Sequence, residues 1–235
     1  MKSKLITFVM GLLLAGSALA VDSGGNSVYI DQTNADNSSV SITQTGSDNK
    51  VGDPNSLLNP SFKFDGNGIT ATINQDGMGN SLTGGIIGGG TIANINQTGN
   101  YNSTDLNMGN FGTDGGVLNL NITGNTNTTG LNIGTSHDSG NYNYGLTITG
   151  NSNAITSTIN SKNTTNSITV SGDSNSITTT QIGANGTTQS GGHSLTISNI
   201  GSNNTISATQ NGTTNPNSAT INVTGSNAAV SVIQH

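Results

Sequence analysis

The chain has 235 residues, of which only 7% are charged, with 34 Gly, 3 Pro and neither Cys nor Trp. All 11 acidic residues are Asp and all 5 basic residues are Lys, so the formal net charge is −6. This balance lacks the basic footprint of a nucleic-acid-binding protein, and the missing Cys excludes stabilisation by disulfides.

The first twenty residues have the pattern of a secretory signal peptide. Lys2 and Lys4 precede the apolar run 5–16, and Ala18-Leu19-Ala20 is a small-residue cleavage site. We expect cleavage after Ala20, which leaves three Lys against eleven Asp and hence a charge of 3 − 11 = −8. The apolar run is too short to span a bilayer comfortably, and we expect no membrane span later in the chain.

Residues 21–26 form a short N-terminal segment, and strand-like alternation begins at Ser27 and continues to residue 235. The chain is rich in Asn, Thr, Ser and Gly, which is typical of disordered segments. However, Ile, Val and Leu recur in short alternating clusters, which indicates strands, and no apolar set recurs at helical spacing. We therefore expect an all-β chain after the signal peptide.

A Gly-x-x-Asn motif recurs seven times at spacings of 22 to 31 residues. An eighth copy begins at Gly225 but has Ala228 in place of Asn. Gly adopts positive φ without a Cβ penalty, and Asn is the next-best residue for such a conformation, so the motif predicts a tight corner. The corner residues are Gly46, Asn49, Gly77, Asn80, Gly99, Asn102, Gly124, Asn127, Gly150, Asn153, Gly172, Asn175, Gly201 and Asn204.

Residues on both sides of each corner alternate between apolar and polar, which predicts two half-buried strands per repeat. A strand, a corner, a second strand and a second corner in about 22 residues form one coil of a solenoid, and each coil buries its apolar face only against its neighbours. The sequence therefore predicts a β-solenoid of about eight two-strand coils over 27–235, with a thin interior between two sheets.

Longer segments are predicted at the second corner of several coils. They comprise 52–68, 109–116, 134–145, 183–193 and 211–218, and they contain all three prolines (Pro54, Pro60 and Pro216). The Gly-x-x-Asn corner is never lengthened, so we call its side of the rod the smooth edge and the opposite side the loop edge. Five aromatic residues fall in these segments, and we expect them to pack partly on the loops rather than make adhesive contacts: Phe62, Phe64, Phe111, Tyr142 and Tyr144.

Six glutamines occupy predicted interior positions. Gln44, Gln75 and Gln97 lie in the first strands of consecutive coils, and Gln181, Gln210 and Gln234 lie in the second strands of consecutive coils. A buried amide is costly unless it is hydrogen-bonded, but equivalent amides on stacked coils can bond along the axis. We therefore predict two glutamine ladders.

The repeats resemble those of the curlin family, which read Ser, five residues, Gln-x-Gly-x-x-Asn-x-Ala, three residues, Gln. The segment from Thr91 to Met108 matches at Gln97, Gly99 and Asn102, and segments 27–37 and 39–49 match similarly. The resemblance implies a secreted subunit that passes through the periplasm and assembles into extracellular, cell-surface amyloid fibres (curli fimbriae) of the biofilm matrix. It also implies axial self-assembly, other curlin-type subunits as partners, and a dedicated secretion and chaperone system.

The chain ends favour polymerisation, because no helix, charged run or proline closes the strand pattern at Ser27 or at residues 228–235. Val223 in the last coil is expected to meet Gln32 or Gln44 of the next subunit, which would interrupt the first-strand ladder. An alternative is a monomeric secreted solenoid with a Thr-rich face, either ice-binding or an adhesin, based on triplets such as 70–72, 147–149 and 178–180. The shaft of a phage fibre is a third possibility.

No motif predicts an enzyme, a metal site or a cofactor. His137, His193 and His235 are isolated, so we expect them to be solvated, and the Asp residues lack the paired arrangement of acid–base catalysis. The calcium-binding nonapeptide of secreted β-rolls is missing, and the Gly-rich stretch 84–90 lacks the Lys of a phosphate loop.

Overall fold

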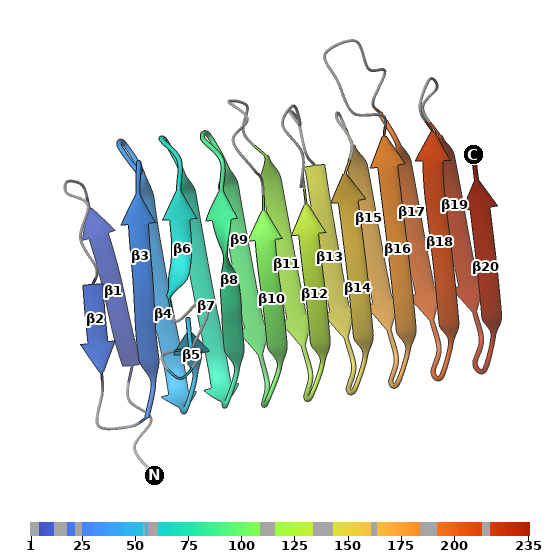
Figure 1. Ribbon diagram of the computed structural model, residues 1–235. Coiled ribbons are helices and arrows are strands. Elements are labelled where there is room, and N and C mark those ends of the chain that lie inside the picture. The colour runs from blue at the N-terminus through green and yellow to red at the C-terminus, as the bar shows by residue number, and fades with distance from the viewer. Residues whose placement is uncertain are drawn as a thin grey trace.

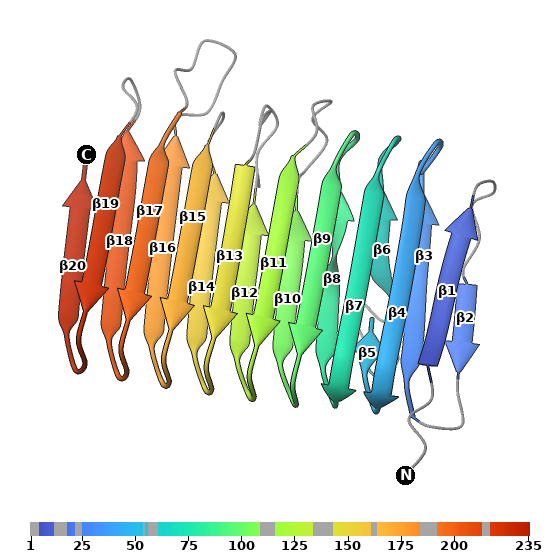
Figure 2. The ribbon, with the colours of Figure 1, turned by 180° about the vertical axis from the view of Figure 1, so that it is seen from behind.

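The computed structural model describes residues 5–11, 18–21, 25–53, 55, 61–108, 116–133, 143–160, 164–183, 192–212 and 217–235. Two long sheets lie face to face and form a flattened rod (Figures 1 and 2). The described residues form strands and turns only, so none of them forms a helix that could cross a membrane.

The two sheets alternate along the chain. Sheet A contains β4 (Ser39–Ser47), β7 (Thr70–Met78), β9 (Ile92–Thr98), β11 (Val117–Thr123), β13 (Asn143–Thr149), β15 (Thr165–Ser171), β17 (Ser194–Ile200) and β19 (Ser218–Thr224). Sheet B contains β3 (Ser27–Thr33), β5 (Lys50–Val51), β6 (Phe62–Asp65), β8 (Ser81–Ile87), β10 (Ser103–Met108), β12 (Thr128–Ile133), β14 (Ala154–Asn160), β16 (Ser176–Gly183), β18 (Thr205–Gly212) and β20 (Ala229–Gln234).

Each sheet A strand from β4 to β19 is followed by a strand of sheet B, which gives eight two-strand coils. Seven connections join one coil to the next, so the solenoid has about seven complete turns. Neighbouring strands are parallel and in register, as in the columns Ile73–Ile95–Leu120 and Ile155–Ile177–Ile206. The predicted all-β solenoid is confirmed.

The core is a thin layer between the sheets, because alternate residues of most strands from β3 to β20 point inward. In β11 the side chains of Leu118, Leu120 and Ile122 are buried and those between them are exposed. This alternation continues along the rod, so that the interior is one continuous cluster of Ile, Val, Leu and a few aromatic residues. Each coil thus covers the apolar face of the next.

Glycine is required at the smooth edge for two independent reasons. Gly99 and Gly124 have φ values of +112° and +131°, which side chains with a Cβ rarely adopt. A Cβ on Gly99 would also collide with the carbonyl oxygen of Gly124, because successive corners stack directly on one another. The third residue of most corners, such as Tyr101, is also left-handed, with φ +57°.

The segment 52–68 differs from the prediction. Residues Phe62–Asp65 form β6, which pairs with both β3 and β8 and completes the sheet B strand that Lys50–Val51 begins. The extra residues therefore interrupt the second strand, and the corner itself spans about 66–69. Phe62 and Phe64 are fully buried core residues with rings 5.1 Å apart, because they hold inward positions of this strand.

Other predicted boundaries shift for the same reason. Tyr144, assigned to the 134–145 insertion, lies in β13 and is buried in the core, because it occupies the same inward column as Leu118. The Gly116 and His193 ends of two other insertions are also buried. Phe111, Tyr142 and the central parts of the predicted insertions lie outside the described residues.

Three strands lie at the N-terminal end of the rod. β3 belongs to sheet B, where it pairs with β5 and β6. The two segments β1 (Leu5–Gly11) and β2 (Ala18–Val21), within and at the end of the expected signal peptide, pair antiparallel with β4 and β3.

Alanine substitutions can separate the two roles of the corner glycines. Gly99→Ala should destabilise the fold most, since it suffers both positive φ and the collision with Gly124. Gly225→Ala has φ +125° but no atom near the added Cβ, so only the backbone strain of about 1–3 kcal/mol should remain. Gly130→Ala, with neither constraint, serves as the control. Urea denaturation should rank the three losses in this order; equal losses would contradict the stacked corner.

Candidate functional site

The first glutamine column forms a buried chain of hydrogen bonds. The Nε2 of Gln44 donates to Oε1 of Gln75 at 2.7 Å, and the Nε2 of Gln75 donates to Oε1 of Gln97 at 2.7 Å. Gln97 ends the chain by donating to the Thr104 hydroxyl at 3.0 Å, because the next coil carries Ile122 in this column. All three glutamine side chains are buried.

The second column repeats this arrangement in sheet B. The Nε2 of Gln181 donates to Gln210 at 2.8 Å, and the Nε2 of Gln210 donates to Gln234 at 2.9 Å. Asn166, from the opposite sheet, donates to the Oε1 of Gln181 and so begins the ladder. In both ladders the donor of each rung points toward the C-terminal end of the rod.

The second amide proton is used in the same way by five of the six glutamines, in both sheets. Gln44 donates to the carbonyl of Ser27, which opens β3, and Gln75 and Gln97 make equivalent bonds to Lys50 and Ser81. In the other ladder, Gln210 and Gln234 donate to the carbonyls of Ser194 and Ser218, which open β17 and β19. The two sheets thus present equivalent sites for glutamine.

Asparagines of the smooth edge form a third ladder. The backbone N–H and Nδ2 of Asn102 donate to Oδ1 of Asn80, and the same Nδ2 donates to the carbonyl of Gly124. All seven predicted asparagines take part in this column through equivalent bonds: Asn49, Asn80, Asn102, Asn127, Asn153, Asn175 and Asn204. Each therefore joins three successive coils.

The sequence prediction missed the first rung of this ladder. Asn26, within the segment assigned to 21–26, is buried, and its Oδ1 accepts the N–H of Asn49 at 2.9 Å. Its position directly before a strand, like that of Asn49, is the signal that could have identified it. At the other end the N–H of Ala228 donates to Asn204, and Ala228 itself offers no side-chain acceptor.

A fourth ladder, on the exposed side of the corners, was also missed. Asn100, Asn125 and Asn151 follow the corner glycines, and each backbone N–H donates to the side-chain oxygen in the next coil. Asp173, Ser202 and Ser226 continue the column. The residue type changes along it, so no repeated letter marks it in the sequence.

One of the histidines that the sequence predicts to be solvated is buried. His193 lies just before β17, and its Nδ1 accepts the N–H of Asn217 at 3.0 Å, so the expectation of solvation is wrong for this residue. Burial lowers its pKa from the usual 6.5, and the backbone carbonyls of Ile182 and Gly212 act in the opposite direction. His235 is exposed, as expected, and His137 lies outside the described residues.

A small polar cluster lies inside the rod between the two glutamine ladders. Thr179 donates to Ser157 at 2.8 Å, and Asn166 lies 3.5 Å from the same hydroxyl. Burial raises the pKa of the nearby Tyr144 phenol, with the hydroxyl of Ser157 acting in the opposite direction. These groups fill core positions between ladders.

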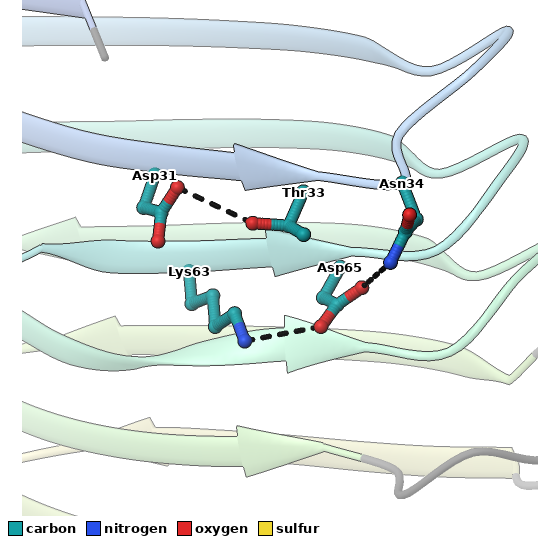
Figure 3. Close-up of polar contacts among 5 residues, drawn as sticks. All are labelled: Asp31, Thr33, Asn34, Lys63 and Asp65. Atoms are coloured by element: carbon teal, nitrogen blue, oxygen red, sulfur yellow. Dashed lines mark hydrogen bonds and ion pairs between the residues drawn. The ribbon is translucent and has the colours of Figure 1, made fainter. Parts of the chain in front are cut away.

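Charged groups are scarce, and several of them meet at the N-terminal end of sheet B (Figure 3). Lys63 pairs with Asp65 at 3.0 Å, and Asn34 donates to the same carboxylate. The Lys63 side chain is 42% exposed, so the pair contributes little to stability. No cluster of three or more His or Asp residues suited to a metal ion occurs in the described ranges.

Comparison with known proteins gives no match to a family model, a curated protein or a solved structure. Within the described residues, the polar groups that recur from coil to coil are the side-chain amides of these columns. An interior rung such as Gln75 accepts from one neighbouring coil and donates to the other.

Replacing one glutamine of a ladder should lower the free energy of unfolding at least as much as replacing all three. Gln75→Leu leaves the Gln97 acceptor and one Gln44 donor unpaired, so we expect a loss of about 1–3 kcal/mol. Replacing Gln44, Gln75 and Gln97 together by Leu leaves no interior amide and mimics the Ile-bearing coils beyond them, so its loss should be no larger. Denaturant titration of both variants decides this; a triple loss three times the single loss would contradict the ladder.

His193 should make stability fall in acid. Because the folded state lowers the pKa, the unfolded chain binds the proton more readily, and stability is lost as pH falls through 6.5. His193→Gln should flatten the dependence of unfolding free energy on pH between about 7 and 5, and His235→Gln, which replaces an exposed imidazole, is the matched control. A flat profile in the parent chain would contradict the burial of a neutral imidazole.

Proposed function

We propose that the chain is a secreted structural subunit, processed after Ala20, that self-assembles along its axis into extracellular amyloid-type fibres. Its role would be that of a curli-like pilus in adhesion and biofilm matrix, with other curlin-type subunits and a dedicated secretion and chaperone system as partners. We assign it no catalytic role and no cofactor. The curlin-like repeats and the parallel, in-register coils support this proposal.

The main support for the proposal is that the outer edges of the last two strands are unpaired. β19 and β20 are the last strands of the two described sheets, and their outer backbone groups face no other described strand. Their inward residues Ala219, Ile221 and Val223, and Val230 and Val232, continue the columns of the interior coils. An exposed strand edge of this kind is a template for another chain, and soluble proteins usually block it with a charge, a proline or a cap.

A monomeric binding solenoid is the alternative, and one surface feature favours it. Sheet B carries outward pairs on three consecutive coils, namely Thr156 with Thr158, Thr178 with Thr180, and Ser207 with Thr209. The array is bounded by Gly130 and Asn132 on one side and by Ser231 and Ile233 on the other. It therefore covers a minority of the coils, fewer than a flat ice-binding face requires.

Assembly of the secreted, processed chain tests the proposal. We expect thioflavin-T-positive fibres in electron micrographs, with a meridional reflection at about 4.8 Å from dried samples. Val232→Lys would place a charge at the inner rim of β20 and should stop elongation, whereas Ser207→Lys, which points outward from β18, should not. A chain that stays monodisperse at high concentration would overturn the proposal, and thermal hysteresis in such a sample would favour ice binding.

A further inference from the structure

We propose that successive subunits of the fibre join with a rotation of about half a turn around the fibre axis. In this joint β3 of one copy pairs with β19 of the preceding copy, and β4 pairs with β20. The proposal rests on the proposed function, because it describes how two copies of the fibre subunit meet. Four observations support it.

The first is that the outermost strands at the two ends of the processed chain lie in the same sheet. Once residues 1–20 are removed, β3 and β20 are the outermost described strands, and both belong to sheet B (Figure 1). In an uninterrupted solenoid the strand after β20 lies in sheet A. A second copy in the same orientation would place β3 on β20 and leave one strand position in sheet A empty, a gap of about 4.8 Å.

A half-turn removes this gap. Strands of sheets A and B run in opposite directions, so rotation about the axis brings β3 onto the sheet A side, parallel to β19. The same rotation brings β4 onto the sheet B side, parallel to β20. The alternation of strands then continues through the joint without a vacancy.

The second observation is an unpaired interior acceptor at the N-terminal end. β1 pairs over Gln44 in the full chain, yet Gln44 Oε1 accepts no hydrogen bond from the described residues, whereas Gln75 and Gln97 each accept one from the preceding rung. Removal of residues 1–20 leaves this acceptor open to another copy. At the opposite end, Gln234 Nε2 bonds only the Ser218 carbonyl and retains a second proton.

The rotated joint pairs these two groups. Gln44 and Gln234 hold the same position in their strands, because each bonds the first carbonyl of the strand facing it, Ser27 and Ser218 respectively. Gln234 of one copy can then donate to Gln44 of the next. The two three-rung ladders become one six-rung ladder across every joint, while Val223 of β19 meets Gln32 of β3 in the other sheet, as the sequence predicts. An unrotated copy would instead bring Gln32 to Gln234 and leave Gln44 Oε1 at the empty strand position.

The third observation is where the asparagine ladder stops. An unrotated copy would place Asn26 next to Ala228, which lacks the acceptor that every other rung provides to the next backbone N–H. In the rotated joint, Asn26 and Ala228 lie on opposite edges of the fibre. In the rotated joint, Ala228 in place of Asn therefore removes no hydrogen bond between the two copies.

The fourth observation concerns the outer face of β20. Ile233 is 63% exposed at the fifth position of its strand. An unrotated copy would place the Asp31 carboxylate beside it, whereas the rotated copy presents Thr43. A β-branched pair is favourable on neighbouring strands, and a carboxylate against Ile is not.

Cysteine cross-linking between copies distinguishes the two joints, because the chain has no Cys of its own. Neighbouring parallel strands lie about 4.8 Å apart, within the Cα separation of a disulfide. The half-turn places Ser231 beside Ser41, and the unrotated joint places Ser231 beside Tyr29. Fibres grown from the secreted, processed Ser41→Cys/Ser231→Cys chain should oxidise to a ladder of covalent multimers on denaturing gels, and the matched Tyr29→Cys/Ser231→Cys chain should not.

The controls separate this proposal from the proposed function. Mixed single-cysteine chains carrying Ser41→Cys and Ser231→Cys should give only dimers. Fibres that cross-link through Tyr29, or through neither pair, would overturn the half-turn while leaving the fibre itself intact. If neither variant nor the parent chain forms fibres, the proposed function fails first.

Discussion

Hydrogen bonding between identical amides on successive coils is the constraint on which the rest of the structure depends. Gln75 accepts from the coil before and donates to the coil after, whereas Asn102 donates to the coil before and accepts from the coil after. A shift of one coil would therefore leave several buried amides unpaired. Apolar side chains tolerate such slippage, because Ile packs on Val nearly as well as on Ile. The amides therefore fix the register, and the aliphatic residues supply most of the buried area.

Glycine allows these ladders to form. The corners approach one another so closely that a Cβ on Gly77 would strike the carbonyl of Gly99, and that carbonyl is the acceptor for the side chain of Asn80. One residue type thus provides the turn, and the other fastens it to the next turn. This coupling explains why the Gly-x-x-Asn corner has a constant length while the opposite edge varies.

Periodicity was sufficient to predict the two-strand coil, the corner and the inward glutamine columns, because these features repeat a residue type at a fixed position. The prediction was less accurate where the repeat is broken. Phe62 and Tyr144 lie next to long insertions, so their inward positions became visible only from pairing with β3 and β11. His193 is buried and hydrogen-bonded to the backbone of Asn217, 24 residues further along the chain, and the sequence has no local signal for this contact. The column through Asn151, Asp173 and Ser202 uses interchangeable acceptors and therefore shows no repeated residue.

The unequal edges have a consequence for the surface of the molecule. β12 ends at Ile133 and β13 begins at Asn143, whereas the corner between β11 and β12 takes only four residues, yet both connections join strands of adjacent sheets that keep their register. Chain length on the loop edge is thus uncoupled from the axial rise. Foreign peptides inserted there would be displayed at regular intervals, so the rod offers a scaffold whose decoration can change while its backbone spacing stays the same.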